Sequence, residues 1–296
     1  PEPQVHGPYA QETTTMQTPQ TAVIQWWKAS RPKSSDAFGP PVRLQIDGRE
    51  VSAPAGASVL NAATVAGMYI PALCAHPDLP PAEQRGCDGK GDGGCNLCLI
   101  EVDGNPEPRK ACSIPVEAGM VIRTNSPALK QARQTHLAKV LGPHPHVCLV
   151  CPQREGCSRT QCSYGNPPET RCCSIFSSCE LRKVSDYIGI PNTTPPYKPV
   201  QLPVFKGEPF FDRDYNLCID CRRCLTACND IRGVGCLEIK EVQTPQGVRR
   251  YVGTIAETLI DSGCKFCQAC VTVCPTGALM DRTLDPARRE ETMVPC

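Results

Sequence analysis

Two tight runs of cysteine near the C-terminal end of the sequence constrain what this chain can fold into. Both have the spacing C-x2-C-x2-C-x3-C, and their members are Cys218, Cys221, Cys224, Cys228 and Cys264, Cys267, Cys270, Cys274. In this spacing the first three thiolates bind three corners of one cubane [4Fe–4S] cluster, and the fourth binds the partner cluster. The runs therefore predict two cubanes with crossed ligands. One is held by Cys218, Cys221, Cys224 and Cys274, and the other by Cys264, Cys267, Cys270 and Cys228.

A pair of structural zinc sites is the alternative interpretation, and it would make the chain a zinc-binding structural or interaction protein. Zinc sites usually use two C-x2-C pairs separated by a dozen or more residues. Each run here instead places four thiols within eleven residues. One departure is visible at Asn229, which follows Cys228 where the run usually carries proline. It removes no ligand.

The composition supports a chain stabilised by inorganic clusters. The 296 residues include 22 cysteines and 31 prolines but only 5% aromatic residues, so the apolar cores are small for the length. Disulfide bonds are the alternative way to stabilise a cysteine-rich chain, and they are favoured in small secreted domains. We find no charged-then-apolar leader and no apolar run of membrane-spanning length, which predicts a cytoplasmic protein with no direct membrane span. Lysine plus arginine (31) nearly balances aspartate plus glutamate (30), which predicts no nucleic-acid partner.

The sequence also predicts a small folded unit over residues 41–125. Residues 42–46 alternate like a strand, Asp47-Gly48 predicts a hairpin turn, and Ser58 predicts the cap of a helix that Gly67 ends. Two further strands are predicted, one directly after Cys98 and one over 120–124. Four cysteines accompany this pattern: Cys74, Cys95, Cys98 and Cys112.

This order resembles the plant-type [2Fe–2S] ferredoxin fold, in the variant found at the N-terminus of the large iron–sulfur subunit of respiratory complex I and of iron-only hydrogenases. The family's ligands follow C-x(n)-C-x2-C-x13-C, so the resemblance implies one [2Fe–2S] cluster on Cys74, Cys95, Cys98 and Cys112. The first gap of twenty residues is longer than the family's usual loop, and it contains Cys87 as an alternative first ligand. Cys74 is favoured because Cys-Ala-His-Pro resembles the family sequence at that ligand.

A second likeness to the same family begins at His144. The sequence H-x3-C-x2-C-x5-C matches the family's histidine-ligated [4Fe–4S] motif, which implies His144, Cys148 and Cys151 as ligands. A neutral imidazole in place of a thiolate would change the cluster charge and its reduction potential. The fourth ligand stays open: the spacing indicates Cys157, but the Glu-Leu that follows the family's last cysteine stands after Cys179.

The segment from about Cys157 to Ser178 looks inserted, and it adds Cys162, Cys172 and Cys173. Residues 144–179 thus hold eight potential ligands, enough for a further cubane in this segment. Neighbouring side chains diverge, so Cys172 and Cys173 are expected to serve different clusters if they bind any. A disulfide or free thiols are the alternative.

The resulting prediction is an α+β chain. Its expected parts are an extended arm over 1–40, a β-grasp [2Fe–2S] ferredoxin domain over 41–125, a small helical and loop domain over 126–189 that binds a [4Fe–4S] cluster, a Pro-rich linker over 190–213, a ferredoxin-like domain with two [4Fe–4S] clusters over 214–281, and a tail over 282–296. Cys236 opens a predicted hairpin in the last domain and is interpreted as buried filler, and Cys296 has no assigned partner.

The resemblance extends over about residues 42–281 and includes the relay portions of NAD-linked hydrogenases and formate dehydrogenases. It implies one [2Fe–2S] and three [4Fe–4S] clusters, with a fourth [4Fe–4S] within 144–179 left open. The chain would relay single electrons between a flavoprotein that oxidises or reduces NAD(P)H and a second catalytic subunit, such as a hydrogenase or a formate dehydrogenase. No Gly-rich nucleotide turn or catalytic triad stands out, so no catalytic residue is predicted. A self-contained iron–sulfur reductase is the alternative.

Overall fold

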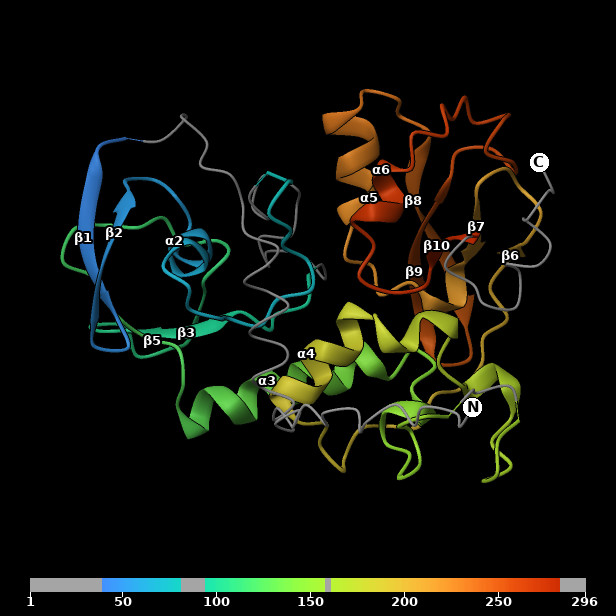
Figure 1. The fold of residues 1–296 in the computed structure, drawn as a ribbon, viewed down its shortest axis with the longest axis horizontal. Helices are drawn as coiled ribbons and strands as arrows, with labels where there is room; N and C mark the ends of the chain where they lie inside the picture. The colour runs from blue at the N-terminus through green and yellow to red at the C-terminus, as the bar shows by residue number, and fades with distance from the viewer. Residues whose placement is uncertain (1–38, 81–93, 158–160, 283–296) are drawn as a thin grey trace, which may run out of the picture.

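The computed structural model describes residues 39–80, 94–157 and 161–282. Almost all of the expected arm, Cys87, the tail from residue 283 and Cys296 lie outside the described residues. Figure 1 shows the N-terminal strands on the left, the C-terminal elements on the right, and the helices α3 and α4 side by side beneath them. The prediction of an α+β chain is confirmed.

The N-terminal part is a mixed five-stranded sheet in the order β2-β1-β5-β3-β4. Its elements are β1 (Pro41–Ile46), β2 (Arg49–Pro54), α2 (Val59–Val65), β3 (Leu99–Val102), β4 (Arg109–Lys110) and β5 (Val121–Arg123). The predicted hairpin forms: Asp47 (φ 48°) and Gly48 (φ 76°) are both left-handed, as a two-residue hairpin turn requires. Ser58 caps α2 by accepting a hydrogen bond from the Asn61 amide.

Buried and exposed residues alternate along β1 and β2, so one face of the sheet faces the core. Leu44 and Ile46 are buried while their neighbours are exposed, and α2 covers this face with Val59, Ala62 and Ala63. The same core contains six buried cysteines, and four of them belong to the N-terminal part, namely Cys74, Cys95, Cys98 and Cys112. The apolar packing of the sheet therefore also positions these sulfurs.

Helix α3 (Pro127–Leu141) is fixed to this sheet by a buried arginine. Ser126 caps the helix, and Pro127 stands in its first turn. Arg133, only 4% exposed, donates hydrogen bonds to the carbonyl oxygens of Leu99 (2.5 Å) and Thr124 (2.9 Å). Gln134 donates in turn to the Ile188 carbonyl at the end of α4 (Glu180–Ile188). The middle segment is thereby joined to the N-terminal sheet.

The C-terminal part combines a three-stranded sheet, a hairpin and two short helices. Its elements are β6 (Val204–Phe205), β7 (Phe211–Asp214), α5 (Arg223–Thr226), β8 (Leu237–Thr244), β9 (Gly247–Thr254), α6 (Ala269–Thr272) and β10 (Leu279–Asp281). The predicted hairpin is β8-β9. The expected linker over 190–213 is not free of strands, because β6 pairs with β7 and β7 pairs with β10.

Across the described ranges, none of the helices is long and apolar enough to span a membrane.

Candidate metal centres

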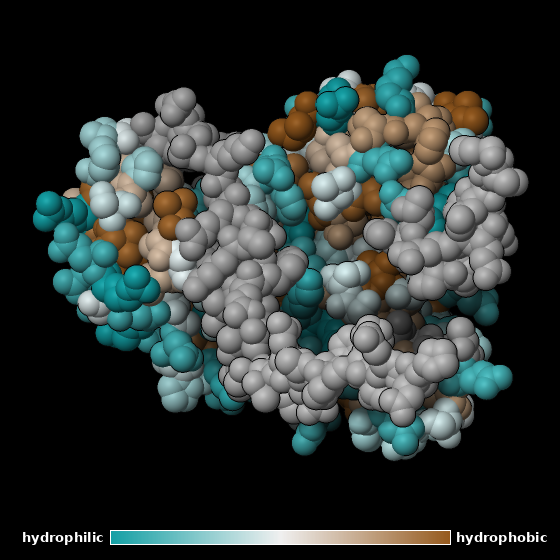
Figure 2. Space-filling model, in the orientation of Figure 1, coloured by the Kyte–Doolittle hydropathy of each residue, from teal (hydrophilic) through white to brown (hydrophobic). Residues whose placement is uncertain are grey.

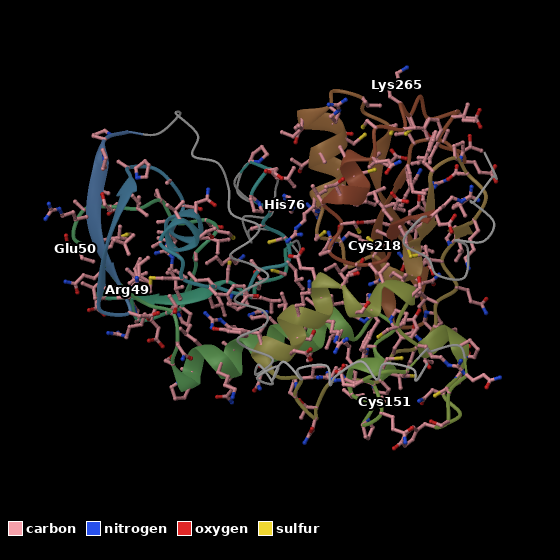
Figure 3. All side chains as sticks on the ribbon, in the orientation of Figure 1. Arg49, Glu50, His76, Cys151, Cys218 and Lys265 are labelled. Atoms are coloured by element: carbon pink, nitrogen blue, oxygen red, sulfur yellow. The ribbon has the colours of Figure 1, made fainter. Side chains whose placement is uncertain are left out.

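The eight cysteines of the two C-terminal runs line two small cavities. One cavity is lined by Cys218, Cys221, Cys224 and Cys274. The other is lined by Cys228, Cys264, Cys267 and Cys270, together with Cys236. The structure thus groups three cysteines of each run with the fourth cysteine of the other run. Figure 3 labels Cys218 inside the right-hand part of the molecule.

Matching backbone conformations surround the two cavities. Asp220 and Arg222 flank Cys221 with φ of 51° and 60°, and Phe266 and Gln268 flank Cys267 with φ of 51° and 57°. A left-handed conformation costs a non-glycine residue roughly 1–2 kcal/mol. Alternating left-handed residues turn backbone N–H groups into a concave nest, which favours an anionic iron–sulfur group. In the second loop the Phe266 amide donates a hydrogen bond to the Cys264 sulfur at 3.3 Å.

The four N-terminal cysteines meet as two pairs. The sulfurs of Cys74 and Cys95 are 3.6 Å apart, and those of Cys98 and Cys112 are 3.3 Å apart. Two thiolates bound at about 2.3 Å to one tetrahedral metal ion lie about 3.8 Å apart. The pairs therefore fit a binuclear centre in which each metal ion takes two cysteines.

Electrostatics in this N-terminal site favour a bound cation. Hydrogen bonding to the sulfurs of Cys74 and Cys98, together with burial, raises the pKa of Cys112. Four buried sulfurs cannot carry negative charge together without compensation, and metal ions supply that compensation. The Leu73 amide also donates to the Cys95 sulfur at 3.2 Å, which stabilises a thiolate at that position.

His144 lies in the core with no hydrogen bond to its ring. The residue is 4% exposed, and neither Nδ1 nor Nε2 has a partner among the residues described. Burial lowers the pKa of His144 to about 3, so the imidazole is neutral at physiological pH. A neutral buried imidazole with an unused nitrogen suits a metal ligand. His146 differs, because its Nδ1 donates to the His144 carbonyl oxygen at 2.8 Å.

Cys172 and Cys173 contact different parts of the molecule. The Cys172 amide donates to the Cys148 sulfur (3.3 Å), and the Cys172 thiol points to the Pro145 carbonyl (3.7 Å). The Cys173 sulfur instead lies so close to Gly277 that a Cβ added there would approach it to 2.5 Å. The structure therefore places Cys172 beside the His144 turn and Cys173 beside the C-terminal part.

The other middle cysteines occupy less enclosed positions, with one exception. Cys179 is buried, and its thiol points to the Pro275 carbonyl at 3.8 Å. Cys162 lies in a loop, where hydrogen bonds to its sulfur from the Asn166 backbone amide and from the Asn166 side chain (3.3 Å) lower the cysteine pKa. Cys151 and Cys157 are half-buried, and Figure 3 shows Cys151 at the lower edge of the molecule.

Arg223 joins the three groups of cysteines. Its guanidinium is 1% exposed and donates to both carboxylate oxygens of Glu180, at 2.8 and 2.6 Å. It also donates to the Ala75 carbonyl at 2.5 Å and to the Val273 carbonyl at 3.3 Å. Ala75, Glu180 and Val273 are direct chain neighbours of Cys74, Cys179 and Cys274. One side chain therefore contacts a loop from each group.

Within the described ranges, no three histidine, cysteine, aspartate or glutamate side chains close around the position of a single metal ion. None of the described cysteines forms a disulfide.

Residues 39–127 match the family model described as a 2Fe-2S iron-sulfur cluster binding domain, and residues 217–278 match the 4Fe-4S dicluster domain. The chain is an iron–sulfur protein. The two matched stretches contain both the paired N-terminal cysteines and the two C-terminal cavities.

Curated relatives of this iron–sulfur protein are parts of NAD(P)H-linked enzymes. It is 31% identical over 245 residues to the NADP-reducing hydrogenase subunit HndD of Solidesulfovibrio fructosivorans, with 80% of this chain and 36% of the relative covered. It is 33% identical over 257 residues to the NADH-ubiquinone oxidoreductase 78 kDa subunit of Neurospora crassa, with 86% and 29% covered. The chain thus spans about a third of the length of these relatives.

A solved structure shares the fold of the iron–sulfur protein. A chain of the NAD+-reducing [NiFe]-hydrogenase in the H2-reduced state has a TM-score of 0.58, with 23% identity, and the likeness covers 81% of this chain and 87% of that one. The fold that positions the cysteines therefore occurs in a solved structure.

Two residues of these centres were missed or misjudged from the sequence. Arg223 stands inside the first cysteine run, and its position there is the only signal that could have drawn attention to it. Cys236 was interpreted as buried filler; it is indeed buried, and it also lines the second cavity. In the sequence, Cys236 stands eight residues after Cys228. That separation indicates a shared cavity only if the loop between the two cysteines turns back, which the sequence does not show.

Proposed function

We propose that this chain is an iron–sulfur electron-transfer subunit of a multisubunit oxidoreductase. It relays single electrons between a flavoprotein that reacts with NAD(P)H and a second catalytic subunit. The hydrogen bonds of Arg223 carry the proposal, because its guanidinium binds residues next to all three cysteine groups. Centres that adjoin in this way can exchange electrons inside one chain.

The proposed ligands follow the grouping of the side chains. Cys74, Cys95, Cys98 and Cys112 hold a [2Fe–2S] cluster, and the two C-terminal cavities hold one [4Fe–4S] cluster each, with the crossed ligands given above. His144, Cys148 and Cys151 hold a third [4Fe–4S] cluster, completed by Cys157 or Cys179. Iron–sulfur clusters accept and release one electron at a time. The chain's own residues set where the electron rests, through burial, hydrogen bonds to sulfur and the neutral His144.

The ends of the proposed relay suit contact with other proteins. Cys267 is the exposed cysteine of the second cavity, and large apolar side chains are exposed in the same part of the chain: Phe210 (57%), Ile231 (52%) and Ile260 (66%). Figure 2 shows apolar surface over the upper right of the molecule. Exposed apolar residues of this size favour a partner surface at that end.

The first prediction is the metal content of the chain purified without oxygen. One [2Fe–2S] and three [4Fe–4S] clusters give about 14 irons per chain, and a further cubane within 144–179 gives about 18. Iron and acid-labile sulfide are to be measured on the same sample. A colourless protein with zinc and no labile sulfide would contradict the proposal, and a count near 10 would remove one cubane from it.

The second prediction concerns His144. His144→Cys replaces a neutral ligand with a thiolate, so we expect the reduction potential of its cluster to fall by on the order of 100 mV. The potential is to be measured by a redox titration followed by electron paramagnetic resonance. His136→Cys, at a half-buried position of α3 outside the proposed ligand set, is the matched control and should leave every potential unchanged. Equal behaviour of the two variants would show that His144 is not a ligand.

A self-contained reductase is a second candidate function, favoured by one cavity of about 690 Å³. Cys172, Cys173, Tyr197 and Lys206 are among its lining residues, and small-molecule sites have this order of volume. A purified single chain that reduces an electron acceptor with a soluble donor, without partner subunits, would support this function. Strict dependence on added partners would exclude it.

A further inference from the structure

The two C-terminal cavities differ by one sulfur. The first is lined by four cysteines, whereas the second is lined by five, because Cys236 joins the four members of the proposed ligand set. Cys236 is 2% exposed, and its sulfur lies 3.4 Å from that of Cys228. Two sulfurs this close to each other can both reach the position of the same iron.

Asn229, which stands after Cys228 where the cysteine run usually carries proline, explains how Cys236 reaches this position. Without proline after Cys228, the chain continues as a π-helical turn over Ala227–Ile231. The loop then returns, and the Val234 amide donates to the Cys228 carbonyl oxygen at 3.0 Å. The Asn229 side chain donates to the Leu237 carbonyl at 3.2 Å, which holds the start of β8 against the turn.

The other half of this part of the chain lacks these features. Cys274 is followed by Pro275, and the chain passes through Thr276 directly into β10. Thr276 donates to the Leu217 carbonyl oxygen at 2.9 Å instead of starting a returning loop. Among the residues that the structure describes, no fifth cysteine lines the first cavity. The extra sulfur is therefore specific to one cubane site, and its position follows from the residues around it.

We propose that Cys236 is a reserve ligand of the second cubane, able to take the place of Cys228 on the same iron. This inference rests on the proposed function in one respect, namely that the cavity holds a [4Fe–4S] cluster. In the exchange the iron–sulfur bond to Cys228 breaks and one to Cys236 forms, while the proton of the Cys236 thiol passes to the Cys228 sulfur. No electron is gained or lost. The short distance between the two sulfurs means that neither has to move far.

The experiment compares four variants of the full chain purified without oxygen: Cys236→Ala, Cys228→Ala, Cys228→Ala/Cys236→Ala and Cys274→Ala. We expect Cys236→Ala and Cys228→Ala to keep the iron content of the parent chain, because one of the two sulfurs remains in each. The double variant is expected to lose about four irons. Cys274→Ala is the matched control in the four-cysteine cavity and is also expected to lose about four. Iron, labile sulfide and the paramagnetic signals of the reduced clusters are the readouts.

Several outcomes would overturn the inference. Loss of about four irons from Cys228→Ala alone would show that Cys236 cannot replace it, and the same loss from Cys236→Ala alone would make Cys236 an obligatory ligand. Retention of all iron by the double variant would show that neither sulfur is needed. The [2Fe–2S] signal serves as the control for folding. A parent chain without iron would instead refute the proposed function, so the two failures are distinguishable.

Discussion

Arg223→Met is expected to destabilise the cluster-loaded chain by about 3–5 kcal/mol. The substitution removes a guanidinium that is 1% exposed and leaves the Glu180 carboxylate, whose side chain is 18% exposed, without its partner. It also leaves the Ala75 and Val273 carbonyl oxygens without their donor. Breaking one side of a buried ion pair is far more costly than the net worth of the intact pair. Urea denaturation followed by circular dichroism and by cluster absorbance measures the loss.

Two further variants decide whether burial is the cause. Arg43→Met removes an arginine from a surface pair with Glu50, in which the side chains are 82% and 64% exposed, so we expect a change within about 0.5 kcal/mol. Arg223→Met combined with Glu180→Met removes both buried charges, and it should recover a large part of the stability. If Arg223→Met were no worse than Arg43→Met, the guanidinium would not hold the three loops together.

Cys221→Ser is expected to abolish the cubane of the first cavity. The variant replaces a buried cysteine that lines this cavity, so the iron content should fall by about four per chain. We expect one low-potential cubane signal to disappear from the electron paramagnetic resonance spectrum. Electron flow between the partner proteins should fall with it, because this cavity lies beside the Arg223 contacts.

Cys296→Ser is the control for this prediction. Cys296 has no assigned role and lies outside the described residues, so the change should leave both the spectrum and the electron flow as they were. The ligand assignment for residues 218–274 would be wrong if both substitutions were silent. A Cys221→Ser chain that lost the [2Fe–2S] signal as well would indicate a general failure to fold.

Local patterns predicted the parts of the fold that local forces determine. The Asp47-Gly48 turn, the Ser58 cap and the β8-β9 hairpin depend on residues close in sequence, and all three form. The cysteine spacings predicted which sulfurs would line each C-terminal cavity, because the spacing itself determines which thiols can face one cluster.

Contacts between distant parts of the chain were beyond prediction. Arg223 and Ala75 are 148 residues apart, so nothing near either residue in the sequence indicates that they meet. The role of Cys236 depends on the return of the loop after the π-helical turn. In the middle segment, the spacing favoured Cys157 and the Glu-Leu sequence favoured Cys179, and the sequence alone did not decide between them. Burial of Cys179 against Pro275 could not be seen without the fold.

The guanidinium contacts of Arg133 and Arg223 also bear on the rate of the proposed electron transfer. Electron tunnelling slows steeply as donor and acceptor move apart, and a hinged linker would make that separation fluctuate. Here two buried guanidinium groups donate hydrogen bonds to main-chain carbonyl oxygens of other segments and so hold those segments together. Electron transfer within the chain should therefore proceed at a steady rate. Any regulation of that rate should act at the contacts with partner proteins.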